Sequence, residues 1–192
     1  DQSLRVVEQL EQKYPNYSGL NLTWEVREGL MKHHHGQRHP SRRTDFEALN
    51  SSLEAQVANL ADEITYYSHD LDDGLDAGLL QEDRLFKDVE IWHANSERVQ
   101  KEFPDLHDES RRYFIIRCII DDQVKDVIRH SYEQIEAAGI KSSDDARLQA
   151  NRLISYTDKR RILNLELRKY LYANLYYHPE VHEPHKRAMH ML

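Results

Sequence analysis

Hydrophobic residues recur every three or four positions along most of the chain, which is the period of an amphipathic α-helix. The pattern predicts helices over residues 1–13, 23–32, 51–70, 82–101, 108–138 and 158–177. Proline and glycine mark several of their ends, at Pro15, Pro104, Gly139 and Pro179. Residues 140–157 are less regular, with a short helix expected near 145–154, and Pro184 is expected to open a last short helix. Because no stretch alternates convincingly as a strand does, the sequence predicts an all-α fold.

The helix expected over residues 51–70 has two different sides. Ser51 to Glu54 spell a Ser-Ser-Leu-Glu capping box at its start. At about 100° per residue, one side carries a core stripe of Leu53, Val57, Leu60, Ile64, Tyr67 and Leu71. The opposite side carries Asp62, Tyr66, His69, Asp70 and Asp73, continued upstream by Ala55 and Ala58.

Asp62, Tyr66 and Asp70 are four residues apart and therefore form one row along this helix. Asp is unfavourable inside a helix, whereas its short carboxylate suits a metal ion or the donors of a polar ligand. We therefore expect a helix covered on both sides, with Asp62 buried. The row would span about 12 Å, the reach of a nucleoside sugar and its first phosphate. The alternative is an ordinary solvated acidic face.

The same periodicity predicts further core positions. They are Leu85, Val89, Trp92, Ile116, Ile120, Val124, Val127, Ile135, Ile162, Leu165, Leu167, Leu171 and Leu175. Trp24 and Cys118 are also expected in the core. Four tyrosines, Tyr170, Tyr172, Tyr176 and Tyr177, either pack within the protein or between subunits, or stack on a nucleotide base.

Composition and charge narrow the function classes. The 192 residues are enough for one domain and carry a formal net charge of -8, which argues against a general nucleic-acid surface without excluding a local one. With one cysteine, no signal peptide and no apolar run near the roughly 18 residues of a membrane span, we expect a cytoplasmic protein without membrane contact. Residues 33–52 are basic and rich in breakers, and are expected to form a mobile loop, either simply solvated or attracting polyphosphate.

Five blocks, at residues 1–10, 19–23, 28–33, 54–74 and 167–179, resemble in order and spacing the deoxyguanosinetriphosphate triphosphohydrolase-like (dNTPase) family of HD-domain phosphohydrolases. The most specific block runs from Glu54 to Gly74 and contains Leu-Ala-Asp-Glu-Ile and His-Asp-Leu-Asp-Asp-Gly. The resemblance implies an all-α HD-domain helical bundle. It also implies hydrolysis of a dNTP, such as dGTP, to a deoxynucleoside and tripolyphosphate.

The resemblance assigns roles to the row. The family metal site follows the pattern His…His-Asp…Asp, and Asp62 matches its final Asp, which implies a bound divalent ion such as Mg, Mn, Fe or Zn. Tyr66 matches the ring that leaves no room for a 2′-hydroxyl. Asp70 matches the carboxylate that accepts from the 3′-hydroxyl.

Cations for the triphosphate are also implied. Lys32 falls near a phosphate-contacting lysine of the family, and Arg112 and Arg117 lie in a region where relatives contribute phosphate-binding cations. Relatives are commonly homo-oligomers, often hexamers, and the same is expected here.

The chain departs from the family in one respect. The first His, the His-Asp pair and the catalytic His/Glu segment would all lie upstream of residue 1, so no catalytic residue is expected within the chain, and His69-Asp70 matches the sugar block instead. The chain begins and stops within helical patterns, which indicates a fragment of a longer polypeptide. The resemblance implies that this fragment is the middle to C-terminal portion of a single HD-type domain. Two alternatives stay open: a catalytically inert HD-like module that binds nucleotides or nucleic acid, and a plain helical oligomerisation or scaffold domain.

Overall fold

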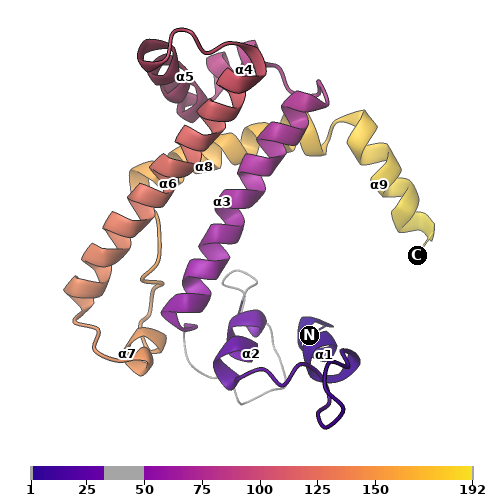
Figure 1. Ribbon diagram of the computed structural model, residues 1–192, viewed down its shortest axis with the longest axis vertical. Helices are drawn as coiled ribbons and strands as arrows, with labels where there is room; N and C mark the ends of the chain where they lie inside the picture. The colour runs from indigo at the N-terminus through magenta and orange to yellow at the C-terminus, as the bar shows by residue number, and fades with distance from the viewer. Residues whose placement is uncertain (1, 33–49, 192) are drawn as a thin grey trace. The chain divides into compact units, whose positions relative to one another are not determined.

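The computed structural model describes residues 2–32 and 50–191, and these residues form helices without a single strand (Figure 1). In chain order the elements are α1 (Gln2–Arg5), η1 (Val6–Leu10), α2 (Trp24–Met31), α3 (Leu53–Asp76), α4 (Glu82–Asp88), α5 (Glu90–Glu102), α6 (Asp108–Ala138), α7 (Ser143–Arg147), α8 (Asp158–Leu171), η2 (Tyr172–Tyr176) and α9 (Pro179–Met191). The elements η1 and η2 are single π-helical turns. The predicted all-α fold is confirmed. Most of the loop predicted at 33–52 lies outside the described residues.

The chain divides into two compact units. The first contains residues 1–61 and 131–155, and the second contains residues 62–130 and 156–192. The long helices α3 and α6 each contribute to both units. The described part of the chain has no helix long and apolar enough to cross a membrane.

The second unit has a continuous hydrophobic core. Its buried members come from α3, α4, α5, α6, α8, η2 and the connections on either side of α4, and they are Tyr67, Leu71, Leu75, Leu80, Leu85, Val89, Ile91, Trp92, Val99, Ile115, Ile116, Ile119, Leu167, Tyr170, Leu171 and Leu175. Cys118 and Ile120 are partly buried and pack against this core. Leu71, Trp92 and Leu171 were predicted core positions and are confirmed. Burial of such side chains is the main favourable term for a helical unit of this size.

Four predicted core positions are wrong, because Val57, Val124, Ile162 and Leu165 are exposed. Ile162 is 65% exposed although it lies on the apolar stripe of α8. Periodicity gives the side of a helix that faces inward, but it does not say where the neighbouring helix ends. Trp24 is only partly buried, because its ring packs against Arg147 rather than in a hydrophobic core.

α3 continues beyond its predicted end at residue 70, and Gly74 leaves room for Leu80 against its last turns. A Cβ at this position would lie 2.7 Å from Leu80 Cδ1, so only glycine lets the turn after α3 fold back against the helix. Leu80 N–H closes that turn by donating to the Gly74 carbonyl at 2.8 Å. The helix therefore reaches Asp76, and this extension brings further carboxylates onto α3.

Other predicted boundaries shift by small amounts. The N-terminal helix ends at Leu10 rather than near residue 13, and Ser52, not Ser51, caps α3 by accepting from Ala55 N–H at 3.3 Å. The helix predicted at 82–101 is broken at Val89, whose φ of -132° and ψ of 104° are extended. Pro184 lies inside α9, which begins at Pro179. By contrast, α6 spans the predicted residues, and Gly139 ends it with the positive φ (61°) expected of a C-cap glycine.

Leu171→Ala tests the core of the second unit. Leu171 is 0% exposed, so truncation should lower the free energy of unfolding by about 2–5 kcal/mol, measured by urea denaturation. The matched control is Ile162→Ala on the same helix, which should change it by less than about 0.5 kcal/mol. Equal losses in the two variants would contradict this assignment of the core.

Candidate functional site

The predicted row lies along the part of α3 that belongs to the second unit. Asp62 and Tyr66 are exposed, Tyr66 by 51%, and Asp70 is partly buried. The expectation that the Asp62 carboxylate is buried is therefore wrong. The side of α3 expected to be covered by a second helix is largely open over residues 62–73, because His69 and Asp73 are exposed as well. The opposite side is buried through Ile64, Tyr67 and Leu71.

A tyrosine from η2 lies beside Tyr66 and Asp70 of the row. The Tyr176 hydroxyl donates a hydrogen bond to Asp70 Oδ2. The Tyr176 ring lies 6.0 Å from the Tyr66 ring at an interplanar angle of 34°, and 4.8 Å from the Tyr172 ring in an edge-to-face arrangement. Both Tyr172 and Tyr176 belong to the π-helical turn η2, a distortion that often occurs at functional sites. Asp70, Tyr66, Tyr172 and Tyr176 therefore form one aromatic and acidic cluster.

The surroundings of Asp70 and Tyr66 favour the protonated form of each side chain. Burial, and then repulsion from Asp73, raise the pKa of Asp70 to about 6, while nearby His69 lowers it. Burial and the Asp70 charge raise the pKa of the Tyr66 hydroxyl above its usual value. A carboxylate that titrates near neutrality can accept a hydrogen bond when ionised and donate one when protonated. The cluster is therefore suited to a neutral ligand with hydroxyl groups.

Arg168 is a cation that sequence reasoning missed. Its guanidinium carbon lies 5.5 Å from the centre of the Tyr172 ring, and its positive charge acts on the hydroxyls of Tyr66 and Tyr67. The sequence could have indicated this arginine through its spacing. Arg168, Tyr172 and Tyr176 are four residues apart and therefore lie along one side of a helix. The arginine places a positive charge next to the row on α3.

Lys32 lies in the first unit, where an ion pair and a hydrogen bond to a backbone carbonyl hold its ammonium group. Its Nζ donates to Glu28 Oε1 at 2.7 Å and to the carbonyl of Asn50 at 3.0 Å. Glu28 in turn binds Arg147 of α7. The lysine is thus fixed at the C-terminal end of α2, whereas Thr23 caps the opposite end by accepting from Val26 N–H.

The two predicted α6 arginines differ. Arg112 Nη2 lies 3.3 Å from Asp76 Oδ1, and its Nε lies 3.8 Å from Glu82 Oε1, so carboxylates already surround it. Asp62 and Asp76 are separated by about 21 Å along α3, so Arg112 does not lie near Asp62. Arg117 is exposed on α6. The structure therefore does not bring Arg112 together with Asp62, and the role of Arg117 stays a prediction.

The metal prediction depends on Asp62 alone. Within residues 2–32 and 50–191, no group of three or more His, Cys, Asp or Glu side chains is placed to hold a metal ion. Asp62 is an exposed oxygen donor, which fits a ligand that completes a site with residues from elsewhere. The predicted roles of the three row residues stay predictions.

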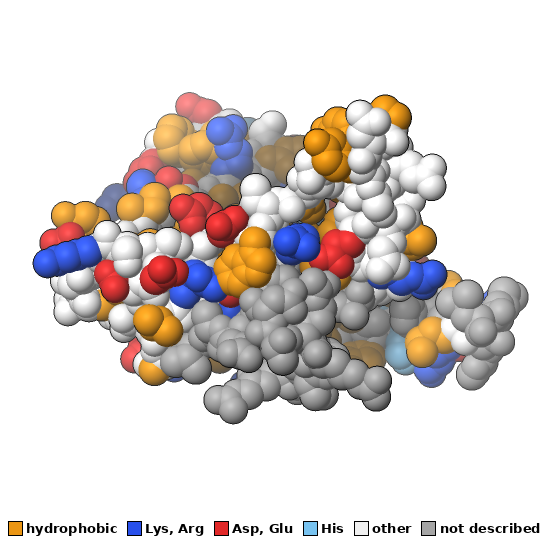
Figure 2. Space-filling model, turned by 90° about the horizontal axis from the view of Figure 1, so that it is seen from below, with side chains coloured by type: hydrophobic (Ala, Val, Ile, Leu, Met, Phe, Trp, Pro, Cys, Tyr) orange, Lys and Arg blue, Asp and Glu red, His pale blue; other side chains and the backbone are white. Residues whose placement is uncertain are grey.

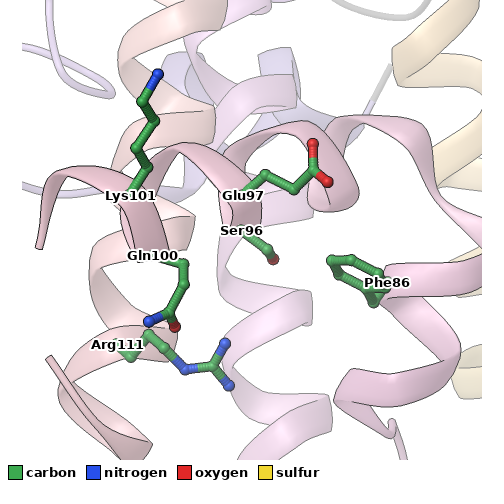
Figure 3. A pocket seen from close by; sticks show the side chains of 6 residues that line it. All are labelled: Phe86, Ser96, Glu97, Gln100, Lys101 and Arg111. Atoms are coloured by element: carbon green, nitrogen blue, oxygen red, sulfur yellow. The ribbon is translucent and has the colours of Figure 1, made fainter. Parts of the chain in front are cut away.

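A different depression lies between α4, α5 and α6 (Figure 3). It is lined by Phe86, Ser96, Glu97, Gln100, Lys101 and Arg111, none of which belongs to the predicted site. Gln100 lies beside Arg111, and Lys101 extends away from both. Arg111 is also paired with Glu82.

Side chains of both charges lie on the described part of the surface. On the face drawn in Figure 2, Lys and Arg side chains lie among Asp and Glu side chains and among hydrophobic ones. Such a mixed face is not the basic stripe typical of a nucleic-acid-binding surface.

Comparison with curated proteins shows similarity along almost the whole chain. The chain is 36% identical over 189 residues to a deoxyguanosinetriphosphate triphosphohydrolase-like protein of Geobacter metallireducens, a match that covers 97% of this chain and 49% of that protein. Proteins with the same name match from Brucella anthropi, at 37% identity over 94% of the chain and 49% of the relative, and from Caulobacter sp., at 33% over 100% and 52%. The chain spans about half the length of the curated relatives it matches. No protein-family model matches it. The predicted resemblance to this family is confirmed.

The raised pKa of Asp70 gives a pH-dependent prediction. A folded pKa of about 6 against an ordinary 3.8 means that the folded protein prefers the protonated acid, so ionisation of Asp70 lowers stability as pH rises through this window. Asp70→Asn should therefore gain stability relative to the wild type between about pH 4 and pH 7, measured by urea denaturation at several pH values.

The control is Asp105→Asn, an exposed carboxyl between α5 and α6. Its stability difference from the wild type should stay nearly constant over the same pH range. A flat difference for Asp70→Asn would show that burial does not disfavour this carboxylate.

Proposed function

We propose that the chain is the middle to C-terminal portion of a metal-dependent deoxynucleoside triphosphate triphosphohydrolase. Its substrate would be a dNTP such as dGTP, and its products a deoxynucleoside and tripolyphosphate. The observation that carries the proposal is the 33–37% identity, over nearly the whole chain, to proteins named for this activity. The polar row on α3 supports it, because the row offers a carboxylate, a phenol ring and a second carboxylate at the spacing of a nucleotide.

Tyr66 and Asp70 of the row would bind the deoxyribose. Asp70 would accept a hydrogen bond from the 3′-hydroxyl, and the Tyr66 ring would occupy the space that a 2′-hydroxyl needs. Tyr176 supports this role, since its hydroxyl holds the Asp70 carboxylate and its ring lies beside Tyr66. A site that positions both groups before the substrate arrives loses less entropy on binding.

Asp62 would supply one ligand to the divalent ion. A short carboxylate is an accepted ligand of Mg, Mn, Fe and Zn alike, so this residue alone does not choose among them. The remaining ligands, two His and one Asp by the family pattern, would come from the other part of the full protein. Such an ion, when bound, polarises a phosphate oxygen and lowers the pKa of a bound water.

Cations would balance the charge of the triphosphate. Arg168 is the best supported in the second unit, because it lies beside the sugar cluster, whereas Lys32, a candidate from the family resemblance, is paired with Glu28. Arg117 on α6 is a further candidate, whereas Arg112 is already paired with Asp76 and Glu82. Stabilising charge that develops on the phosphates is usually the largest electrostatic contribution to such a reaction.

The full protein would be a homo-oligomer, as the family resemblance implies. Exposed apolar side chains on α8 and η2 support this part of the proposal, since Leu165, Tyr172 and Tyr177 line a shallow apolar depression together with Arg168 and Lys169. Exposed apolar surface of this kind is common at protein interfaces.

A second candidate is a catalytically inert module that binds a nucleotide. It is favoured by one observation, namely that the described residues provide Asp62 but no group of three metal ligands. Both candidates keep the sugar cluster of Tyr66, Asp70 and Tyr176, and they differ in whether a metal ion binds and dGTP is consumed.

Asp62→Ala in the full-length protein separates the two candidates. The variant should bind less divalent metal and lose more than about 100-fold in dGTP turnover, because a direct ligand is removed. Metal content and release of tripolyphosphate are the measurements. The control is Glu133→Ala, an exposed carboxylate of α6, which should keep both. Undiminished turnover in Asp62→Ala would refute the metal role, and a metal-free, inactive wild type would support the inert module.

Tyr66→Ala tests the sugar contact. Loss of the ring should open space for a 2′-hydroxyl and reduce the preference for dGTP over GTP by about 10-fold or more, measured as the ratio of kcat/KM values. Tyr132→Ala, which removes an exposed tyrosine of α6, should leave this ratio unchanged. An unaltered ratio in Tyr66→Ala would mean that the ring does not contact the sugar.

A further inference from the structure

A buried pair of amide side chains joins α6 to α8 inside the second unit. Gln123 Nε2 donates to Asn164 Oδ1 at 3.0 Å, and the two residues are 0% and 3% exposed. The nearby core positions on the same helices are apolar, with Ile119 one turn before Gln123 and Leu167 almost one turn after Asn164. The pair is therefore a polar contact set beside a hydrophobic core.

The pair leaves two of its polar atoms unused. Gln123 Oε1 and Asn164 Nδ2 are buried and have no hydrogen-bond partner among the described residues. A buried polar atom without a partner costs free energy, whereas two apolar side chains of similar size would fill the same space without that cost. Stability alone therefore does not account for the amides. What they add is direction, because a hydrogen bond forms only at one alignment of the two helices.

A second polar contact joins the same two helices. Asp126, on the same side of α6 as Gln123, accepts from the N–H and from the hydroxyl of Thr157, each at 2.9 Å, and Thr157 is the N-cap of α8. Thr157 and Asn164 are seven residues apart, which is about two helical turns. The contact at Thr157 fixes where α8 begins, and the contact at Asn164 fixes the rotation of α8 about its own axis.

The alignment of α8 decides where η2 lies. α8 continues directly into η2, so Asn164 and Tyr176 belong to one helical segment and lie about 18 Å apart at 1.5 Å per residue. Along this segment the chain meets first α6, at Gln123, and then α3, where the Tyr176 hydroxyl donates to Asp70 (Figure 1). A rotation of α8 would therefore carry that hydroxyl away from Asp70.

We propose that Gln123 and Asn164 are positioning residues for the sugar cluster: their hydrogen bond fixes the rotation of α8 and so sets where Tyr176 meets Asp70. A single buried amide can fix the register of helices that otherwise touch through apolar side chains. The effect on the substrate rests on the proposed function, in which Asp70 contacts the sugar. The alignment of Tyr176 with Asp70 is a property of the folded chain and does not rest on it.

Matched apolar substitutions separate positioning from stability. In the full-length protein, Gln123→Met and Asn164→Leu keep the approximate size of each side chain and remove its amide. Each one alone should lower the midpoint of urea denaturation, because its partner is left unpaired in the core, and the double variant should return the midpoint to the wild-type value or above it. In spite of this stability, kcat/KM of the double variant for dGTP should fall by about 5-fold or more.

Tyr176→Phe tests whether the pair acts through the tyrosine hydroxyl. In the wild-type background the substitution should lower kcat/KM for dGTP by about 5-fold or more, because Asp70 loses its donor. In the double variant it should change kcat/KM by less than about 2-fold, because the contact is already lost. The control is Asn95→Leu, which removes a buried amide whose hydrogen bond, to the Ile91 carbonyl at 2.8 Å, stays within α5. This variant should keep the wild-type kcat/KM and the full effect of Tyr176→Phe.

The outcomes separate the two proposals. A wild type that does not hydrolyse dGTP ends the proposed function, and a crystal structure of the double variant then tests the positioning role by itself, with the Tyr176 hydroxyl expected beyond about 3.5 Å from Asp70. A folded double variant that keeps this hydrogen bond, or that keeps the kcat/KM of an active wild type, overturns the positioning role. If the double variant does not fold, a single variant that folds replaces it. If none folds, the pair is a structural requirement and the positioning role is overturned.

Discussion

The packing of one side of α3 is the constraint on which the candidate site depends. Tyr67, Leu71 and Leu75 are buried in the core of the second unit, and this burial fixes the rotation of the helix about its axis. With those residues inward, the helical period directs Tyr66 away from the core and leaves Asp70 at its edge. The core therefore decides which polar groups face a ligand. Gly74 belongs to the same constraint, since it lets Leu80 pack against α3.

The candidate site also depends on Tyr176, a residue far from α3 in the sequence. Tyr176 reaches Asp70 across 106 positions of sequence, and its π-helical turn brings it beside Tyr66. Partial burial raises the pKa of Asp70, and the hydroxyl of Tyr176 gives the carboxylate a defined orientation. In the first unit, Glu28 and Arg147 are joined across 119 positions and hold Lys32 in a similar way. In the second unit the carboxylate of proposed function is thus held by a partner from a distant element.

The sequence predicts the local features well and the distant ones poorly. The bounds of α6, the Thr23 cap and the burial of Leu71 and Trp92 follow from periodicity and capping, which act over a few residues. The exposure of Val57 and Asp62, which lie on opposite sides of α3, was not predicted, because it depends on which parts of α3 other elements cover. Four-residue spacing was enough to single out the row. It could not show that Tyr176 or Arg168 would lie beside it, since no local pattern encodes a contact between α3 and the end of α8.

A crystal structure of the full-length protein with a divalent ion and a non-hydrolysable dGTP analogue is the most direct test of the α3 row as a nucleotide site. The account predicts the ion within about 2.0–2.6 Å of an Asp62 carboxylate oxygen. It also predicts the deoxyribose between the Tyr66 ring and the Asp70 carboxylate. An analogue bound elsewhere, with Asp62 in contact with neither the ion nor its water ligands, would contradict it.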